Sequence, residues 1–159
     1  MNKEALGELI IENQEMFYRV SKTILYNDDD CADAISNMIV TSFSKRHTLR
    51  NENYAKTWLT RILINECYQI IRKNKKVVSL DDYEESHNVV SDDSDISEYS
   101  DLYEAIMKLK EKDRICVQQY YIEGYSVREV AKMLKSSETA IRKRLARSRE
   151  KLKMELGEV

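Results

Sequence analysis

Apolar residues recur every three or four positions through most of the chain, which is the spacing of amphipathic helices. In the first half this pattern predicts one long helix, or two in line, over 3–26. A second helix follows a cap-forming cluster at 27–30 and runs to about Lys45. A third is predicted over 54–73, after the polar and partly basic loop 45–53. The N-terminal half is therefore predicted to be a small helical domain.

The helical pattern returns near the end of the chain. It predicts short helices around 102–109 and 115–122, the second of them ended by Gly124, because glycine is the usual residue just past a helix. Two further helices follow from residue 125. There is no proline and only three glycines, so the turns between helices are expected at Asn, Asp and Ser residues. This half is predicted to be a four-helix module.

Charge separates the two halves. The formal net charge is −2, yet residues 77–107 contain no Lys or Arg and hold ten of the 28 acidic residues. The rest of the chain has 18 acidic against 26 basic residues, a balance of +8. We interpret the acidic, Ser-rich stretch 77–98 as a flexible linker between two basic domains, 1–76 and 99–159. The predicted fold class is all-α: two small helical domains, the C-terminal one with a helix-turn-helix.

Residues 125–151 carry the helix-turn-helix pattern. Ser126 and Glu129 have the spacing of a capping box, and a short turn over 135–137 separates the first helix from a second that starts near Ser137 or Glu138. In the second helix, seven of the twelve residues 142–153 are basic. In a helix-turn-helix this helix lies in the DNA major groove; its first residues contact bases and later ones contact phosphates.

That geometry predicts which residues contact DNA. The base-contacting group is Ser137, Glu138, Thr139, Arg142 and Lys143. Three further cations, Arg144, Arg147 and Arg149, are expected to divide between phosphate contacts and pairing within the protein. The alternative is a basic helix that only faces solvent. DNA binding is favoured because the capped helix, the small-residue turn and the cationic helix occur together.

A second candidate surface lies on the helix predicted over 54–73. Aromatic, amide and guanidinium side chains recur there every three or four residues, and we call this row the aromatic-basic face: Tyr54, Trp58, Arg61, Asn65, Tyr68 and Arg72. Such a mixture suits single-stranded DNA, because bases stack on rings while the backbone meets positive charge. The alternative is that Trp58 and Tyr68 complete the core, which is the better interpretation of either residue taken alone. On the preceding helix, the outward row with Asp33, Ser36 and Asn37 is interpreted from spacing alone as solvent-exposed surface rather than a partner-binding face.

Other classes of protein have little support. Cys31, Cys67 and Cys116 each lie in an apolar helical pattern and are expected to be reduced, buried residues of a cytosolic protein. The two histidines, His47 and His87, stand alone, so neither a metal site nor a cofactor is expected. No nucleophile–base pair or phosphate-binding loop is found, so the chain is not expected to be an enzyme. No apolar run approaches the roughly 18 residues of a membrane span, so no membrane insertion is expected.

Taken together, these motifs resemble a bacterial RNA polymerase sigma factor of the extracytoplasmic-function group of the sigma-70 family. The resemblance covers nearly the whole chain and rests on four stretches: DDDCADAISNMIVTSFSK, YAKTWLTRILINECYQIIRKNKK, SLDD, and LKEKDRICVQQYYIEGYSVREVAKMLKSSETAIRKRLARSREKL. Three departures stand out. Ser36-Asn37 replaces the usual Gln-Glu, Leu109-Lys110 replaces Leu-Pro, and Lys135 replaces a turn glycine and is therefore expected to tolerate positive φ at some cost.

The resemblance implies a non-catalytic specificity subunit with two DNA-binding domains. The N-terminal domain would dock on the clamp coiled coil of the beta-prime subunit of core RNA polymerase through Asp33, Ser36 and Asn37. It would open the minus-ten element with Tyr54, Trp58, Arg61, Asn65 and Arg72, while the loop 47–53 captures an unstacked base. The C-terminal domain would bind the beta flap and, through the residues named above, the minus-thirty-five element of promoter DNA. The resemblance also implies a cytoplasmic protein, with an anti-sigma partner that is often membrane-bound.

Two other functions stay open from the residues alone. A stand-alone helix-turn-helix regulator would bind DNA tightly without polymerase, whereas a sigma factor is expected to bind strongly only as holoenzyme. A helical interaction adaptor, whose basic helix is only surface, would be indifferent to DNA. The salt dependence of binding separates the adaptor from both, because phosphate contacts make affinity fall steeply with salt.

Overall fold

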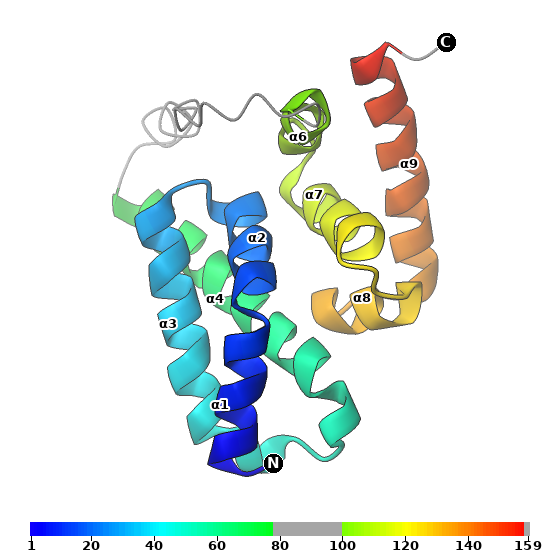
Figure 1. The fold of residues 1–159 in the computed structure, drawn as a ribbon. Coiled ribbons are helices and arrows are strands. Elements are labelled where there is room, and N and C mark those ends of the chain that lie inside the picture. Colours follow the sequence, from blue (N-terminus) through cyan, green and yellow to red (C-terminus); the bar gives the residue numbers. More distant parts are fainter. Residues whose placement is uncertain (78–99, 158–159) are drawn as a thin grey trace.

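The computed structural model describes residues 1–77 and 100–157, and all regular elements in these two ranges are helical (Figure 1). The elements are α1 (Lys3–Glu12), α2 (Gln14–Leu25), α3 (Asp28–Ser44), the 3-10 turns η1 (Arg46–Thr48) and η2 (Glu52–Tyr54), α4 (Ala55–Val77), α6 (Ser100–Met107), α7 (Glu111–Val117), the π-helical turn η3 (Gln118–Ile122), α8 (Val127–Leu134) and α9 (Glu138–Leu156). The all-α prediction is confirmed. The predicted linker, 77–98, falls almost entirely outside the described residues, so it stays a prediction.

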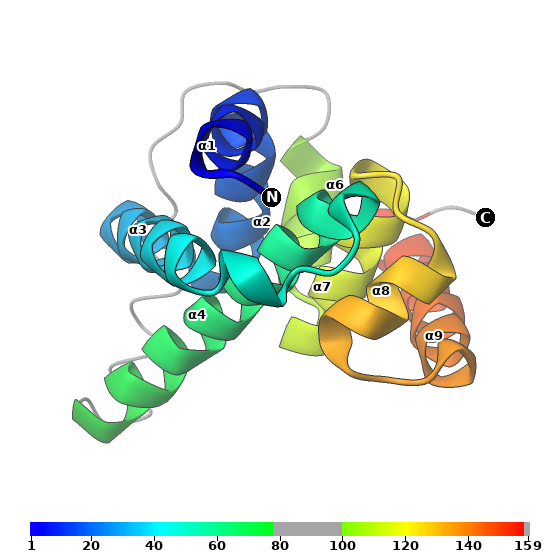
Figure 2. The same cartoon turned by 90° about the horizontal axis from the view of Figure 1, so that it is seen from below.

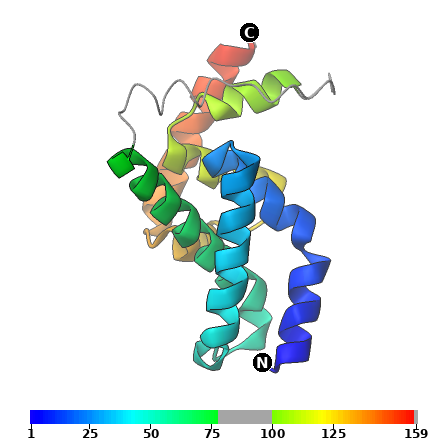
Figure 3. The ribbon, with the colours of Figure 1, turned by 90° about the vertical axis from the view of Figure 1, so that its left-hand side faces the viewer.

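The first predicted helix is two helices, α1 and α2, separated at Asn13. The Asn13 side chain donates from Nδ2 to the Leu9 carbonyl at 2.8 Å, so it satisfies a carbonyl near the end of α1. α3 packs against both α2 and α4, and Figure 3 shows it running between α4 and the α1–α2 pair. Phe17 and Ile24 of α2 are completely buried in this core.

The core side of α4 differs in part from the one that the apolar spacing predicts, which is Leu59, Ile62, Leu63, Cys67, Ile70 and Ile71. Leu59, Leu63, Cys67 and Ile71 are buried as expected, but Ile62 and Ile70 are only partly buried, and Ile64 is completely buried instead. The reason is that α4 has neighbours on two sides, since α2 and α3 pack on it and α8 packs on it as well. A single three-to-four stripe describes a helix with one covered side and therefore misses Ile64.

The helix-turn-helix is built as predicted. The Glu129 backbone N–H donates to Ser126 Oγ at 3.1 Å, and the Ser126 backbone N–H donates to Glu129 Oε1 at 3.2 Å, which completes the capping box. Lys135 ends α8 in the left-handed conformation at φ 52°, which confirms the expected positive φ. Ser137 caps α9 by accepting from the Ala140 N–H at 3.1 Å. Along α9, Ile141, Leu145 and Ser148 are buried, and Leu152 is partly buried.

The remaining part of the C-terminal module follows the predicted order with small shifts. Gly124 follows η3 at φ +81°, as expected of a residue past a helix end. The helix predicted around 102–109 is defined by Leu102, Ile106 and Leu109. Leu109 lies just beyond α6 but is buried, whereas Leu102 lies in the first turn of α6 and is exposed.

In α8 the apolar spacing predicts a stripe of Val127, Val130, Ala131 and Leu134. Met133, outside that stripe, is also buried, while Val127 and Leu134 are only partly buried.

The cysteines are buried and free, as predicted. Burial raises the pKa of the Cys116 thiol to about 11, so this thiol is protonated at neutral pH. No helix in the described ranges is both long enough and apolar enough to span a lipid bilayer. Within 1–77 and 100–157, no group of three or more His, Cys, Asp and Glu side chains is arranged to hold a metal ion.

The C-terminal module packs directly on the N-terminal helices. α8 contacts α4, and α7 contacts α2. Figure 2 shows α8 lying beside the N-terminal half of α4, and one cluster of buried side chains extends through both halves. We call this packing the closed arrangement. α8 contacts both candidate DNA-binding helices, α4 and α9, so it lies between them.

Candidate nucleic-acid interface

The cations of α9 divide into exposed and paired groups. Arg142, Lys143 and Arg147 are exposed. Arg144 is partly buried, and its Nη1 lies 3.0 Å from Oδ1 of Asp113, whose side chain is only 5% exposed. Arg149 Nη1 donates to the Tyr121 hydroxyl at 2.8 Å. Arg144 and Arg149 are therefore the two of the three arginines that pair within the protein. Arg147 has no partner among the described residues, so it is the one available for a phosphate contact.

The first turn of α9 presents the predicted base-contacting residues to solvent. Ser137, Glu138 and Thr139 are exposed, and the positive end of the helix dipole lies at this turn. Arg142 Nη2 lies 3.6 Å from Glu138 Oε1, a long and exposed pair that contributes little to stability. The Ser137 hydroxyl already accepts the Ala140 N–H, so its first role is to cap the helix. Glu138 and Arg142 are therefore freer than Ser137 to contact DNA, because their only interaction is this long pair.

The aromatic-basic face of α4 is not an open surface. Lys132 of α8 places its Nζ 4.8 Å from the centre of the Tyr54 ring, a cation–π contact that leaves Tyr54 46% exposed. Trp58 is partly buried and Arg61 is exposed. Since Tyr54, Trp58 and Arg61 share one side of the helix, the first half of this face is turned toward α8.

Farther along α4, Tyr68 lies near enough to Glu111 of α7 for the carboxylate to act on its phenol. Tyr68 is partly buried, and burial raises the pKa of its phenol, with the Glu111 carboxylate of α7 as the next contributor. Its hydroxyl is buried without a hydrogen-bond partner in the described part of the chain. Asn65 is partly buried, and Arg72, near the end of α4, is exposed. The C-terminal module therefore lies against part of the aromatic-basic face, at Tyr54 and near Tyr68, and leaves Arg61 and Arg72 exposed.

A basic hollow separates the two predicted DNA-binding surfaces. It has a volume of about 590 Å³ and is lined by Arg61 from α4 and by Arg128, Ala131, Lys132, Lys135, Ser136, Ser137 and Glu138 from α8, the turn and α9. Four of these residues are cations and one is an acid. The first turn of α9 thus faces α4 across the hollow. An anionic ligand fits this lining by charge.

The predicted polymerase-binding residues lie on the exposed side of α3. Asp33, Ser36 and Asn37 are all exposed and share one side of the helix. Val40, one turn farther on, is 69% exposed and adds an apolar group to the row. Val40 was not predicted as part of this surface, although a valine beside an otherwise polar outward row is a signal in the sequence. The row is thus mixed in character, as protein-binding surfaces are.

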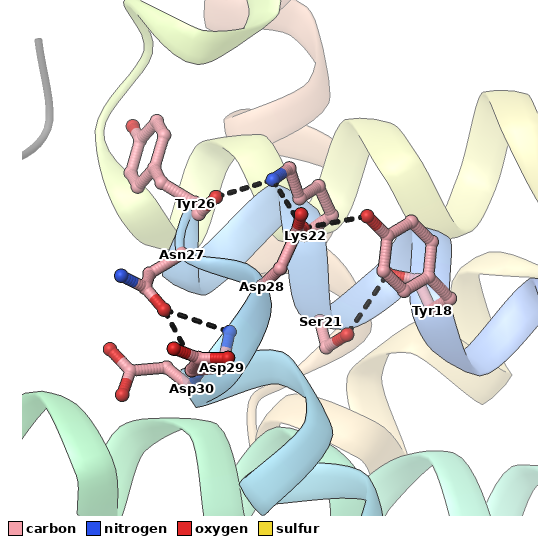
Figure 4. A network of polar contacts seen from close by, with 8 residues as sticks. All are labelled: Tyr18, Ser21, Lys22, Tyr26, Asn27, Asp28, Asp29 and Asp30. Atoms are coloured by element: carbon pink, nitrogen blue, oxygen red, sulfur yellow. Dashed lines mark hydrogen bonds and ion pairs between the residues drawn. The ribbon is translucent and has the colours of Figure 1, made fainter. Parts of the chain in front are cut away.

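An unusual turn joins α2 to α3 (Figure 4). Tyr26 has φ 64° and ψ −43°, and the Asn27 N–H donates to the Leu25 carbonyl at 2.6 Å, which makes a γ-turn of the rarer, positive-φ kind. Lys22 holds it by donating from Nζ to the Tyr26 carbonyl at 2.5 Å and to Asp28 Oδ1 at 2.7 Å. Hydrogen bonds from Lys22 and then from Tyr18 lower the pKa of Asp28. The predicted cap at 27–30 is confirmed, because Asn27 Oδ1 accepts the N–H groups of Asp29 and Asp30, but the γ-turn at Tyr26 was not predicted.

The Tyr26 side chain belongs to the contact between the two halves. The guanidinium carbon of Arg114, from α7, lies 5.2 Å from the centre of the Tyr26 ring. Arg114 is 7% exposed, and its Nε donates to the Thr23 carbonyl at 3.1 Å while Nη1 donates to the Leu109 carbonyl at 2.8 Å. The Tyr26 hydroxyl donates to the Met107 carbonyl at 3.3 Å. Tyr26 is thus bonded to both α6 and α7 of the other half.

Two further polar contacts join the halves. Arg19 of α2 forms a two-pronged ion pair with Glu123, with distances of 3.0 Å from Nε and 2.9 Å from Nη2. On α4, the Thr57 hydroxyl donates to Glu129 Oε2 at 3.2 Å, so the capping-box carboxylate also contacts the N-terminal half. These partners are 72 or more residues apart in the sequence, so local pattern could not identify them.

Comparisons with known proteins define the class of protein. A family model described as Sigma-70 region 2 matches residues 9–77, and one described as Sigma-70, region 4 matches residues 99–152. The chain is 25% identical over 154 residues to RNA polymerase sigma factor SigV of Bacillus subtilis (strain 168), covering 97% of this chain and 92% of SigV. It is 23% identical over 156 residues to ECF RNA polymerase sigma factor SigM of Mycobacterium tuberculosis, covering 98% and 79% of the two chains.

Solved structures have the same fold. The sigma factor RpoE in complex with the anti-sigma factor NepR from Bartonella quintana matches with a TM-score of 0.79 at 18% identity, covering 98% of both chains. CnrH in complex with the cytosolic domain of CnrY matches with a TM-score of 0.69 at 20% identity, covering 98% of this chain and 90% of CnrH. Both matches therefore extend over the N-terminal and the C-terminal helices.

Two sigma regions in this order, with α4 in the first and the helix-turn-helix in the second, are the parts of an RNA polymerase sigma factor. The chain belongs to the sigma-70 family. Within that family it is an alternative sigma factor of the extracytoplasmic-function group, and its function is to direct transcription initiation.

Proposed function

We propose that this sigma factor divides promoter recognition between its two halves, 1–76 and 99–159. α9 would read the minus-thirty-five element, the aromatic-basic face of α4 would open the minus-ten element, and the exposed side of α3 would hold the clamp coiled coil of the beta-prime subunit. The observation that carries the proposal is that two cationic surfaces of different chemistry lie on the helices matched to region 2 and region 4.

The chemistry of α9 supports duplex recognition. Arg142 and Lys143 are exposed one turn from the helix start, where side chains reach base edges, and Arg147 is exposed farther along, where phosphates lie. Glu138 can accept a hydrogen bond from a cytosine amine, and Arg142 can donate two to a guanine. Arg144 is better assigned to stabilising the domain through Asp113 than to DNA.

The chemistry of α4 supports single-strand capture. Tyr54 and Trp58 offer rings on which unstacked bases can lie, Asn65 offers an amide for base edges, and Arg61 and Arg72 offer charge for the backbone. Extruding a base costs a few kcal/mol, and stacking of about 1–3 kcal/mol per base offsets that cost. The loop 47–53 lies directly before this face and is exposed except for Leu49.

The polymerase contacts and the regulatory partner complete the proposal. Asp33, Ser36 and Asn37, with Val40 beside them, give α3 a small polar and apolar docking row for the clamp coiled coil. The C-terminal domain would also contact the beta flap. RpoE and CnrH are each held by a protein partner, NepR and CnrY, and we extend an anti-sigma partner of that kind to this chain. The factor would be a non-catalytic, cytoplasmic subunit.

Run-off transcription tests the proposal. Core polymerase would be mixed with fragments of genomic DNA, with and without the chain, and the starts would be mapped. New starts that share upstream elements, and that appear only with the chain, are expected. Starts unchanged by the chain would refute it. Tight binding of the chain alone to duplex DNA would favour a stand-alone regulator, and binding to neither DNA nor polymerase would favour an adaptor.

A further inference from the structure

The basic hollow between α4, α8 and α9 has the size of a small-molecule site. Its volume of about 590 Å³ lies within the range of about 300–1,000 Å³ that ligand sites occupy. Most ligand sites are lined mainly by apolar side chains, but among the described residues that line this hollow Ala131 alone is apolar. A ligand that fits this hollow is therefore hydrophilic and is recognised by charge.

Four cations from three elements meet in the hollow. Arg61 lies on α4, Arg128 and Lys132 lie on α8, and Lys135 lies in the turn before α9. All four are exposed, and none forms an ion pair with a carboxylate in the described ranges. A hollow lined by charges of one sign raises the local concentration of the opposite ion. An anion bound here would relieve the repulsion between these cations.

The nearby carboxylates do not neutralise this charge. Glu138 is the only acid among the described lining residues, and its Oε1 lies 3.6 Å from Nη2 of Arg142, on the same helix. Glu129 of α8 accepts from the Ser126 backbone N–H and from the Thr57 hydroxyl. Both carboxylates thus have partners other than the four cations, so the positive charge of the hollow remains available to a ligand.

The first turn of α9 adds hydrogen-bond donors to the charge. Ser137 Oγ accepts the Ala140 N–H, whereas the backbone N–H groups of Glu138 and Thr139 have no acceptor in the described part of the chain. Free N–H groups and the positive end of a helix dipole together bind phosphate groups. Two donors of fixed direction beside four cations match a ligand with several charged oxygens.

We propose that the basic hollow is a binding site for a small molecule that carries several phosphate groups, either a nucleoside polyphosphate or an inorganic polyphosphate. Its phosphates accept from the first-turn N–H groups of α9 and from Arg128, while Arg61 binds them from α4. Arginine suits this role because its guanidinium donates two parallel bonds to a phosphate.

The site overlaps the first turn of α9. Since Ser137 and Glu138 line the hollow, the phosphorylated ligand competes with duplex DNA for this turn. That competition rests on the role proposed for α9, whereas the binding site itself does not.

Inorganic tripolyphosphate and ATP, each without divalent metal ions, are the probes. Isothermal titration calorimetry of the full chain, with neither DNA nor polymerase, should show saturable binding of one tripolyphosphate per chain that weakens as salt screens the cations. Equal affinities for the two probes would show that the phosphate groups alone are recognised, and tighter binding of ATP would show that the nucleoside also contributes. Absence of saturable binding of either probe would overturn the site.

Variants distinguish the hollow from general attraction to a basic surface. Arg61→Gln and Arg128→Gln should each weaken tripolyphosphate binding about tenfold, because each removes a charged hydrogen-bond donor. Arg128→Lys, which keeps the charge, should recover part of the loss. The matched controls are Lys73→Gln on α4 and Lys151→Gln on α9, two exposed cations outside the hollow, and they should bind as the wild type does. Equal losses in hollow and control variants would overturn the site, and so would an unchanged affinity in Arg61→Gln.

Backbone amide chemical shifts locate the bound phosphates. On addition of tripolyphosphate, the N–H resonances of Glu138 and Thr139 should shift most, and those from Arg142 onward should shift little. If the largest shifts fell beyond Arg142, the outward cations of α9 would bind the probe and the hollow would not be the site. Because neither measurement involves promoter DNA, failure of the site would leave the proposed promoter contacts untouched, and failure of those contacts would leave the site untouched.

Discussion

The two candidate DNA-binding helices differ in how they are presented. α9 is capped and carries exposed cations; Arg144 and Arg149 are bonded to other helices, while Arg142 makes only a long, exposed pair with Glu138 of its own helix. α4 carries aromatic side chains that the other half partly covers, with Lys132 on Tyr54 and Thr57 bonded to Glu129. The difference fits the two roles that we propose, since duplex DNA is always available to a groove-reading helix, whereas single-stranded DNA exists only once a promoter opens.

On the proposed roles, α9 contacts duplex DNA before α4 contacts a single strand. The exposed part of α9, from Arg142 to Arg147, can meet the phosphates of a duplex by charge alone. On the proposed roles, the aromatic-basic face binds DNA only once a bubble forms.

The largest expected effect lies within α9 and concerns stability. Arg144→Ala leaves the buried Asp113 carboxylate without its partner, which should cost about 3 kcal/mol, near the low end for a buried pair because Arg144 is partly exposed. Arg147→Ala, the matched control on the same helix, should change the free energy of unfolding by less than about 0.5 kcal/mol. Urea denaturation measures both. Equal losses would show that the two arginines do not have different roles.

Arg142→Ala should weaken binding of the holoenzyme to promoter duplex by about 2 kcal/mol and relax preference at one base of the upstream element. The reason is that Arg142 is exposed one turn from the start of α9 and is held only by a long pair with Glu138. Lys153→Ala, near the end of α9, is the control. Electrophoretic mobility shifts on promoter variants measure the effect. If the variant lost the same affinity for every promoter sequence, Arg142 would contact a phosphate and not a base.

Tyr54→Ala should slow promoter opening by the holoenzyme, by about 1–2 kcal/mol, while leaving binding to closed duplex unchanged. Removing the ring takes away a stacking surface for an unpaired base. Tyr18 is a suitable control, because it is a tyrosine of the same half with similar exposure, 44% against 46%. Permanganate reactivity of promoter thymines measures opening. If Tyr18→Ala slowed opening as much as Tyr54→Ala, the face assigned to α4 would be wrong.

The smallest effect is a gain in stability. Lys135 holds the turn of the helix-turn-helix at φ 52°, where glycine has no steric cost. Lys135→Gly should therefore raise the free energy of unfolding by about 0.5 kcal/mol, the relief of left-handed strain being partly offset by the greater freedom of glycine in the unfolded chain. Thermal denaturation measures it. A loss of stability would mean that the Lys135 side chain contributes contacts that outweigh the strain.

The features that could be predicted from the sequence have local causes. The capping box of Ser126 and Glu129, the positive φ of Lys135 and the start of α9 each depend on residues within a few positions. The features that were missed depend on distant partners. Arg114 is placed by Thr23, 91 residues away, and Ile64 is buried because α4 is covered on two sides. The γ-turn at Tyr26 is likewise held by side chains of two helices.

The most direct test of the contrast between α4 and α9 uses Trp58, the single tryptophan of the chain, which lies between Tyr54 and Arg61 on the aromatic-basic face. Its emission would be followed while a DNA single strand, or the duplex of the same promoter sequence, is added to the free wild-type chain. We expect stacking to quench Trp58 with the single strand at DNA concentrations at which the duplex leaves the emission unchanged. Equal quenching by both forms of DNA, or none by either, would contradict the role proposed for α4.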